Sequence, residues 1–265
     1  MLYFYVKNNV YPKNQLNYVY FAAPKGKVLS EMTLTRFAEN DFLLMTGAGA
    51  YWHDRDLLNA SLPKNKSFSI ADVTRDLATL LVTGPQAPAI MAAVMDQTTS
   101  ARGFPWLSHQ KVRIAGFEVT AIRVSYAGEA GFELHCKMSD VVSVYDSVLA
   151  TGEAHQLRPF GMLALDSMRL EKGYRSWKAD LTSDYTMLES GLGRWVNFNK
   201  EDFVGRAALQ SESQAGSDRE FVTLVLEDPE DDGPFGEAVY LSSVVIDGAD
   251  AGLVVSCGFG HRVGA

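Results

Sequence analysis

The sequence predicts an α+β fold, in which a body of antiparallel sheets and helices is followed by a partial C-terminal β-barrel. Residues 16–46 and 110–136 alternate apolar and polar side chains, which is typical of half-buried strands. Residues 139–152 and 159–173 carry apolar residues between helix start and stop signals. Beyond residue 219 the chain consists of short strand-like runs separated by turns, a pattern typical of a small barrel.

The first half of the body is expected to contain both strands and short helices. Glu39 and Asn40 are the expected turn between two strands of the first sheet. One short helix is expected over 53–62, and a second in the apolar run PAIMAAVM after the break at 84–85. Residues 68–82 contain two strand-like runs, IADVT and LATLLVTG.

The helix expected over 139–152 has a predicted start, face and end. Ser139 is a candidate N-cap, because a serine hydroxyl accepts a bond from an unpaired backbone N–H of the first turn. Val142, Tyr145, Val148 and Leu149 share one face, which we expect to pack against the body. Gly152 is the expected C-terminal stop.

The chain is expected to divide into two domains. Residues 211–218 (SESQAGSD) are polar and weakly patterned, as in a linker. The predicted domains are therefore 1–210, the α+β body, and 219–265, the incomplete barrel. The length of 265 residues suits one large domain or two smaller ones.

Composition excludes several classes of partner. With 24 basic and 32 acidic residues the net charge is −8, which argues against nucleic acid as a partner because phosphate binding needs a basic face. The sequence predicts no membrane association, since it contains no apolar run of the ~18 residues needed to span a bilayer. Two cysteines and five histidines show neither a disulfide framework nor metal-ligand spacing. These features favour a cytoplasmic location, with the mitochondrial matrix as the alternative.

The segment RVSYAGEAGFELHC at 123–136 contains a candidate binding site. A glycine-rich stretch interrupts two strands there, with Tyr126 and Glu133 on either side of it. A carboxylate on a strand can accept paired hydrogen bonds from the edge of a flat, amidine-like heterocycle. The alternative is a bulged hairpin with surface glutamates.

This segment resembles the Y-T-G-E-x-G-x-E motif of the glycine-cleavage T-protein (aminomethyltransferase) family. The segment that follows in that family is similar to GMLALDSMRLEKGYRSWKADLTSDYTMLESGLGRWVNFNKEDFVGRAAL here. The resemblance extends over 18–264 and is densest at 123–209. The branch that it resembles most is the folate-binding C-terminal half of sarcosine and dimethylglycine dehydrogenases. The segment RLEKGYRSWKADLT is characteristic of that branch.

The resemblance implies a T-protein-like folate-binding body with tetrahydrofolate as the cofactor. Tyr126 and Glu133 fall on positions that contact the folate, with Glu133 on the edge of the pterin ring. The family also places an arginine before the aspartate of the following helix, whereas Leu165 stands at that position here. Arg169, one helical turn further on, can reach similar space.

For Arg169 the alternative is an ion pair on the helix surface with Glu171 or Asp166. The same resemblance indicates two further groups of candidate residues. Tyr174 and Trp177 are expected to stack on a flat ring or to wall it in, with ordinary loop packing as the alternative. Lys178 is a candidate partner for the glutamate tail of folate.

The candidate catalytic residue is Glu31. The family carries paired aspartates in an early strand, and Ser30 and Glu31 align with them. Glu31 keeps a carboxylate but adds a methylene, which moves the charge by roughly 1.5 Å. Because a misplacement of about 1 Å can lower a rate ~10²-fold, Glu31 is either a tolerated substitute or a sign of lost activity. A solvent-facing strand glutamate is the structural alternative.

The function implied is tetrahydrofolate-dependent transfer of a one-carbon unit in glycine, sarcosine or dimethylglycine catabolism. The partners implied are folate and an amine-derived one-carbon donor. One alternative is a non-catalytic folate- or partner-binding fragment, whose FAD-bearing partner is a separate flavoprotein chain; the other is a folded remnant without function. The sequence leaves these alternatives open. No FAD domain is recognised in this chain, and modules of the family usually continue beyond both of its ends, so we expect it to be truncated.

Overall fold

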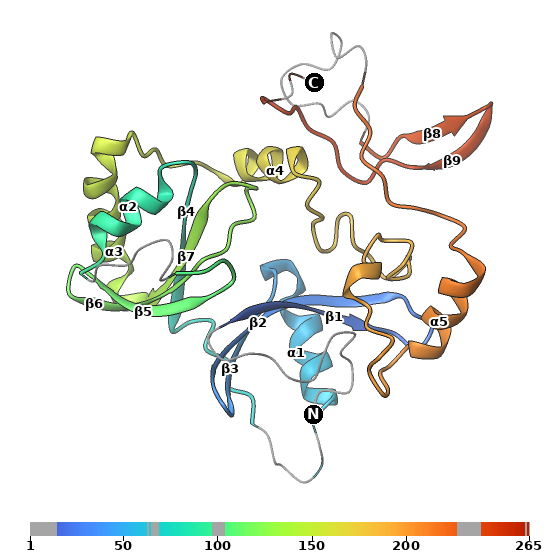
Figure 1. Ribbon diagram of the computed structural model, residues 1–265, viewed down its shortest axis with the longest axis horizontal. Coiled ribbons are helices and arrows are strands. Elements are labelled where there is room, and N and C mark those ends of the chain that lie inside the picture. The colour runs from blue at the N-terminus through green and yellow to red at the C-terminus, as the bar shows by residue number, and fades with distance from the viewer. Residues whose placement is uncertain are drawn as a thin grey trace.

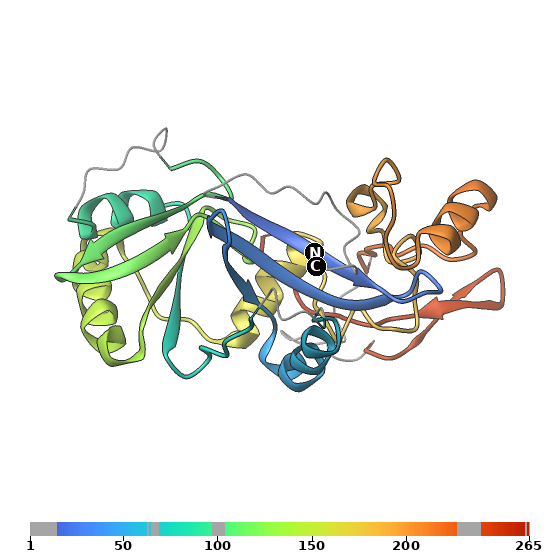
Figure 2. The same cartoon turned by 90° about the horizontal axis from the view of Figure 1, so that it is seen from below.

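The computed structural model describes residues 15–62, 64, 69–96, 104–226, 240–262 and 264. Two antiparallel sheets lie side by side in the body, and helices cover their outer faces (Figures 1 and 2). The sheets join where the backbone N–H of Leu16 donates to the carbonyl of Leu107, at 2.7 Å. The C-terminal segments extend away from the body on one side (Figure 1).

The first sheet has the order β1-β2-β3, formed by β1 (Leu16–Ala22), β2 (Val28–Ala38) and β3 (Asp41–Met45). The turn predicted at Glu39 and Asn40 is confirmed. Helix α1 (Tyr51–Ala60) covers one face, where Leu58 packs on buried residues of the sheet. These buried residues are Val19, Phe21, Met32 and Leu34. Because side chains alternate along a strand, the neighbouring positions of β1 and β2 face the opposite side.

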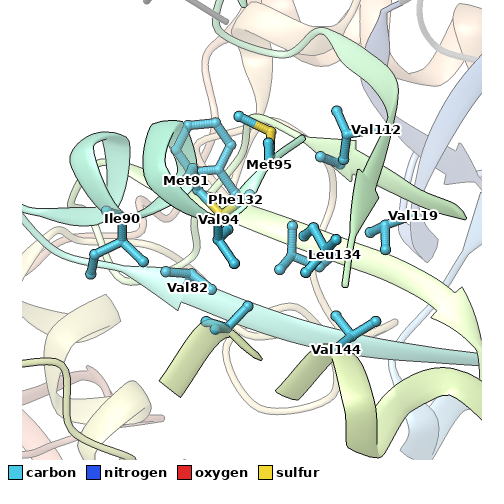
Figure 3. Packing of buried hydrophobic residues seen from close by; sticks show 14 of the residues in the cluster. Val82, Ile90, Met91, Val94, Met95, Val112, Val119, Phe132, Leu134 and Val144 are labelled. Carbon is cyan, nitrogen blue, oxygen red and sulfur yellow. The ribbon is translucent and has the colours of Figure 1, made fainter. Parts of the chain in front are cut away.

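The second sheet has the order β4-β7-β6-β5. Its strands are β4 (Leu77–Thr83), β5 (His109–Ile114), β6 (Phe117–Ile122) and β7 (Gly131–Lys137). Helices α2 (Ala87–Val94) and α3 (Val141–Gly152) cover one face and enclose an apolar core (Figure 3). Leu134 of β7 lies at the centre of this core with no exposed surface. The opposite face of β7 carries Glu133 and His135.

The structure corrects two expectations for this region. The run 70–74 (IADVT) forms no strand, and the strand begins only at Leu77. Ser139 is not the N-cap of α3: it lies in a 3-10 turn, and Asp140 occupies the cap position without a side-chain hydrogen bond. The 3-10 helices are Ala48–Ala50, Met138–Asp140, Glu153–His155 and Gly193–Trp195.

The buried face of α3 also differs from the predicted one. Val144 and Val148 face the core, whereas Val142 is 66% exposed and Tyr145 is 39% exposed. Apolar residues occur on more than one side of this helix, so its sequence is compatible with either face. The positions of α2 and β7, which the helix contacts, select the face that contains Val144.

The second half of the body has little regular structure apart from two helices. Helix α4 (Met162–Glu171) lies within the predicted span 159–173, and α5 (Arg206–Ala215) follows a long irregular segment. The linker predicted at 211–218 is wrong over 211–215, which is helical. Leu209 anchors α5 in a core beneath β1, and the polar residues that follow form the solvent-facing side of the helix.

The barrel predicted for the C-terminal part is not confirmed. Within the described residues of this part, β8 (Ser243–Ile246) and β9 (Ala249–Leu253) form one two-stranded hairpin, and 220–226 contain no strand. The parts of the predicted strand-like runs at 227–239 lie outside the described residues. The division into 1–210 and 219–265 stays a prediction. No helix in the described ranges is long and apolar enough to cross a membrane.

Helix α3 provides a test of the core. Replacing Val144 by Ala removes two buried methyl groups and should lower the free energy of unfolding by about 2 kcal/mol. Replacing Val142 by Ala removes the same groups from an exposed position and should change it by about 0.5 kcal/mol or less. Urea denaturation of both variants measures the difference. Equal losses would contradict the assigned face.

Candidate functional site

The inner faces of the two sheets bring together most of the residues predicted to form the site. Tyr18 of β1 lies within electrostatic reach of Glu31 and Glu133, and of the phenols of Tyr126 and Tyr174. With Tyr20 these residues form what we call the tyrosine–glutamate cluster. Burial raises the pKa of Tyr18 well above its usual range, and the two carboxylates raise it further.

Glu31 lies opposite Tyr20 in the register of β1 and β2. The hydroxyl of Tyr20 donates to Oε1 of Glu31 at 3.3 Å. Burial raises the pKa of Glu31 to about 7, although the Tyr20 hydrogen bond and the positive charge of Arg175 oppose the rise. Glu31 is therefore a partly desolvated carboxyl group and not the solvent-facing strand residue of the alternative interpretation.

Ser30, the other residue aligned with the paired aspartates, faces away from the cluster. It lies opposite Phe21 and is fully buried beneath α1, where its hydroxyl donates to Oδ1 of Asp54 at 2.7 Å. Successive residues of a strand point to opposite faces, so only one of two adjacent positions can reach the cluster. At this position of β2 that residue is Glu31.

Tyr126 and Tyr174 form the aromatic part of the cluster. Their rings are stacked, with centroids 6.1 Å apart and an interplanar angle of 17°. The hydroxyl of Tyr126 donates to the backbone carbonyl of Arg175 at 2.9 Å. Burial raises the pKa of Tyr126 to about 12, and the charge of Arg169 opposes this. Tyr126 thus fastens the segment after α4 to the second sheet.

Glu133 remains accessible, with 28% of its side chain exposed. The glycine-rich segment before it passes close to the side chain of Lys172. Gly128 has a φ of +72°, and a Cβ built there would lie 2.8 Å from Cβ of Lys172 at the end of α4. A larger residue at 128 would therefore be strained and would push the segment away from α4.

Arg169 is buried, with 2% of its surface exposed. Its Nε donates to Asp166 at 2.7 Å, its Nη1 to the carbonyl of Tyr174 at 3.0 Å and to Asp180, and its Nη2 to Ser256 at 2.9 Å. The expected partner Asp166 is present and its side chain is 51% exposed, but the side chain of Arg169 is buried. These contacts hold the segment that carries Tyr174.

A cavity of about 510 Å³ lies beside Arg169, between α4 and the C-terminal segment. Its lining residues come from α4, from the irregular segment after it and from the tail: Asp166, Arg169, Ser176, Ala179, Tyr240, Val255, Ser256 and Cys257. Tyr126 is near both regions: Arg169 and Ser176 lower the pKa of its hydroxyl, and Glu31 and Asp180 raise it. The cavity therefore adjoins the tyrosine–glutamate cluster.

Trp177 packs at the side of the cluster, against the core that contains Tyr20 and Leu181. Nζ of Lys178 lies 4.9 Å from the centroid of the Trp177 ring. Loop packing accounts for these contacts, so the roles of Trp177 and Lys178 in binding stay predictions. Nε1 of Trp177 is nevertheless buried without a hydrogen-bond partner among the described residues.

The sequence analysis missed Tyr18, Tyr20 and Arg175. The spacing of the two tyrosines, two residues apart in a predicted strand, indicates a shared face and could have drawn attention to them. The guanidinium of Arg175 lies 4.6 Å from the ring centroid of Phe221. The position of this guanidinium also requires a glycine at 191, because a Cβ there would lie 2.5 Å from Nη2 of Arg175. Packing between such distant residues leaves no signal in the local sequence.

The fold and the site together define the class of protein. The model of the GCVT N-terminal domain matches residues 3–200, so the chain belongs to this family. The resemblance seen in the sequence is thereby confirmed.

Individual relatives agree with this assignment. Human mitochondrial dimethylglycine dehydrogenase is 32% identical over 92% of this chain and 28% of its own length. Human mitochondrial sarcosine dehydrogenase is 36% identical over 77% of this chain and 24% of its own length. The chain thus spans about a quarter of the length of these two relatives.

A solved structure supports the same fold. The glycine cleavage system aminomethyltransferase T from Bartonella henselae superposes with a TM-score of 0.65, at 25% sequence identity. The match covers 78% of this chain and 55% of that chain. The mixed body of antiparallel sheets and helices is therefore T-protein-like.

The raised pKa of Glu31 predicts a pH-dependent stability. A carboxyl group whose pKa rises on folding, here from 4.5 to about 7, favours the folded state while protonated and opposes it once ionised. The free energy of unfolding of the wild type should therefore fall, relative to Glu31→Gln, as pH rises through this interval. Urea denaturation from about pH 5 to pH 8 measures it. The control Glu118→Gln, at the surface, should parallel the wild type; parallel curves for Glu31→Gln would contradict the prediction.

The buried Arg169 network predicts a large effect on stability. Arg169→Met leaves the carboxylate of Asp180 buried without its counter-charge and should lower the free energy of unfolding by about 3–5 kcal/mol. Lys111→Met breaks a surface pair with Glu118 and should change it by about 1 kcal/mol or less. Chemical denaturation compares the two, and similar losses would argue against a special role for the buried network.

Proposed function

We propose that the tyrosine–glutamate cluster binds tetrahydrofolate and that the chain takes part in transferring a one-carbon unit to it from a donor amine. The observation that carries the proposal is the convergence of Glu31, from the first sheet, with Glu133 of the second sheet and Tyr126 of the loop before it. All three lie around one tyrosine, Tyr18, and the separation of Glu31 from the other two along the sequence gives no reason for them to meet. Membership of the GCVT N-terminal domain family supports the same assignment.

The donors and acceptors of the cluster suit a pterin ring. The ring presents an amino group and an N–H along one edge, and the accessible carboxylate of Glu133 offers acceptors for them. The stacked pair of Tyr126 and Tyr174 offers an aromatic surface for a flat ligand. Two buried donors, Nε of Arg175 and Nε1 of Trp177, have no acceptor among the described residues and suit carbonyl or carboxylate oxygens of a ligand.

Glu31 has the properties of a group that exchanges a proton near neutral pH. When bound, tetrahydrofolate would supply the nitrogen that accepts the one-carbon unit. Glu31 has a pKa of about 7, so it is able to hold or release a proton at physiological pH. The hydroxyl of Tyr20 orients the carboxylate, and the nearby charge of Arg175 favours its ionised form. The burial that raises its pKa also limits its contact with water.

A second candidate function is folate or partner binding without catalysis, with the flavin chemistry on a separate flavoprotein chain. Two observations favour it. Glu31 is longer than the aspartate of the family pattern. Leu165 stands where the family has an arginine, and Arg169, the candidate substitute, already uses its side chain in internal contacts.

The donor amine belongs to the class of glycine, sarcosine and dimethylglycine, in keeping with the names of the relatives.

Binding is tested by calorimetric titration with tetrahydrofolate. The wild type should bind, and Glu133→Gln should bind about tenfold more weakly, because a charged acceptor of a hydrogen bond is lost. The control Glu118→Gln removes a carboxylate from the surface of β6 and should bind as the wild type does. Absence of binding by folded wild-type protein would refute the proposal.

Turnover distinguishes the two candidate functions. With an aminomethyl or iminium donor, whose carbon is already at the oxidation level of formaldehyde, formation of 5,10-methylenetetrahydrofolate above the uncatalysed rate should fall about 10²-fold in Glu31→Gln while folate affinity changes little. Binding without product formation above the uncatalysed rate in the wild type would favour the non-catalytic alternative.

A further inference from the structure

His135 is a buried polar residue that the functions above do not use. It lies two residues after Glu133 on β7, on the same face of the sheet, and 5% of it is exposed. The neighbouring Leu134 and Cys136 point to the opposite face, into the core between the sheet and the helices α2 and α3. His135 therefore faces the side of the sheet that carries the candidate site.

Both ring nitrogens of His135 have side-chain partners. Nε2 lies 3.2 Å from Oε2 of Glu133, and Nδ1 lies 3.0 Å from Oγ1 of Thr79. Thr79 is directly opposite His135 in the register of β4 and β7. The ring is thus held between an accessible carboxylate and a hydroxyl on the adjacent strand.

The chemistry of the partners assigns the direction of these hydrogen bonds. An ionised carboxylate only accepts, so Nε2 of a neutral ring carries the hydrogen and donates to Glu133. Nδ1 is then the acceptor, and the hydroxyl of Thr79 donates to it. The sequence of donors runs from Thr79 through His135 to Glu133. In this arrangement each polar atom of the buried ring has a hydrogen-bond partner.

The arrangement restricts the Glu133 side chain. A glutamate on a strand has three rotatable bonds, and ordering them on binding lowers affinity. The bond from His135 holds Oε2, so the second carboxylate oxygen keeps one orientation toward the cluster. The same bond is charge-assisted and partly buried, which strengthens it relative to a bond in water.

We propose that His135, held by Thr79, is a positioning residue that fixes the Glu133 carboxylate for a ligand with a paired amino and N–H edge. The inference rests on the proposed function, because the ligand used to test it is tetrahydrofolate. It adds a specific requirement: the affinity contributed by Glu133 depends on a hydrogen bond from residue 135. The role passes through Glu133 and involves no direct contact with the ligand.

Substitutions of His135 and of Thr79 test the inference. His135→Phe fills the space of the imidazole ring but donates no hydrogen bond, and Thr79→Val replaces the hydroxyl by a methyl group. Calorimetric titration should show that each of these two variants binds tetrahydrofolate about fivefold to tenfold more weakly than the wild type. This is the effect expected when one charge-assisted hydrogen bond is partly lost. His135→Gln places an amide N–H where Nε2 stood and should recover affinity to within about twofold of the wild type. Thr120→Val is the matched control, because Thr120 pairs with His135 from the other neighbouring strand, β6.

A double-mutant cycle separates positioning from a general structural role. In the Glu133→Ala background, His135→Phe should change the affinity by less than about twofold, since its effect passes through the missing carboxylate. An equal loss in both backgrounds would overturn the inference. So would unchanged affinity in folded Thr79→Val and His135→Phe. If His135→Phe does not fold, Thr79→Val and His135→Gln carry the same test.

The failures of the two proposals are distinguishable. If the wild type binds no tetrahydrofolate, the proposed function fails and the inference with it. If the wild type binds and Glu133→Ala weakens binding, but Thr79→Val and His135→Phe do not, only the inference fails.

Discussion

The contact between the two sheets is the constraint on which the rest of the structure depends. Leu16 of β1 packs with Ile122 and Val124 in one buried cluster, and Tyr18 lies against it. Ile122 is in turn opposite Glu133 in the register of β6 and β7. This apolar contact therefore sets how near the carboxylate of Glu133 comes to that of Glu31, which lies on the other sheet. Without it the two would be surface residues of separate sheets.

Several polar groups of the site are buried, and hydrogen bonds from other segments stabilise most of them. Arg169 and Asp180 are almost fully enclosed, and their bonds to Ser256 and to the carbonyl of Tyr174 offset the loss of water. This network links the irregular segment after α4 to the helix and to the C-terminal segment. Glu31 is different, because a single hydrogen bond from Tyr20 does not fully replace its hydration, and its pKa rises. A carboxyl group whose pKa is raised in this way is characteristic of functional sites.

Predictions from local pattern succeeded where one element determines its own form. The turn at Glu39 and Asn40 and the extents of α2 and α4 follow from alternation, glycine and proline. Predictions failed where a choice depends on neighbours. The sequence of α3 allows two faces, and the face that contains Val144 is buried because α2 and β7 lie there. Residues 211–215 look like a linker, yet they are helical because Leu209 fixes α5 against the core beneath β1.

The sequence by itself determined the family of this protein, the strands that carry Glu31 and Glu133, and the proximity of Tyr126 to Glu133 along the chain. These depend on motifs and on the two-residue period of a strand, which are local properties. Only the tertiary structure decided that Glu31 and not Ser30 faces the cluster, that Tyr18, Tyr20 and Arg175 belong near it, and that Arg169 is enclosed. The physical reason is that burial and hydrogen-bond partners arise from segments far apart in sequence, whose meeting no local pattern specifies.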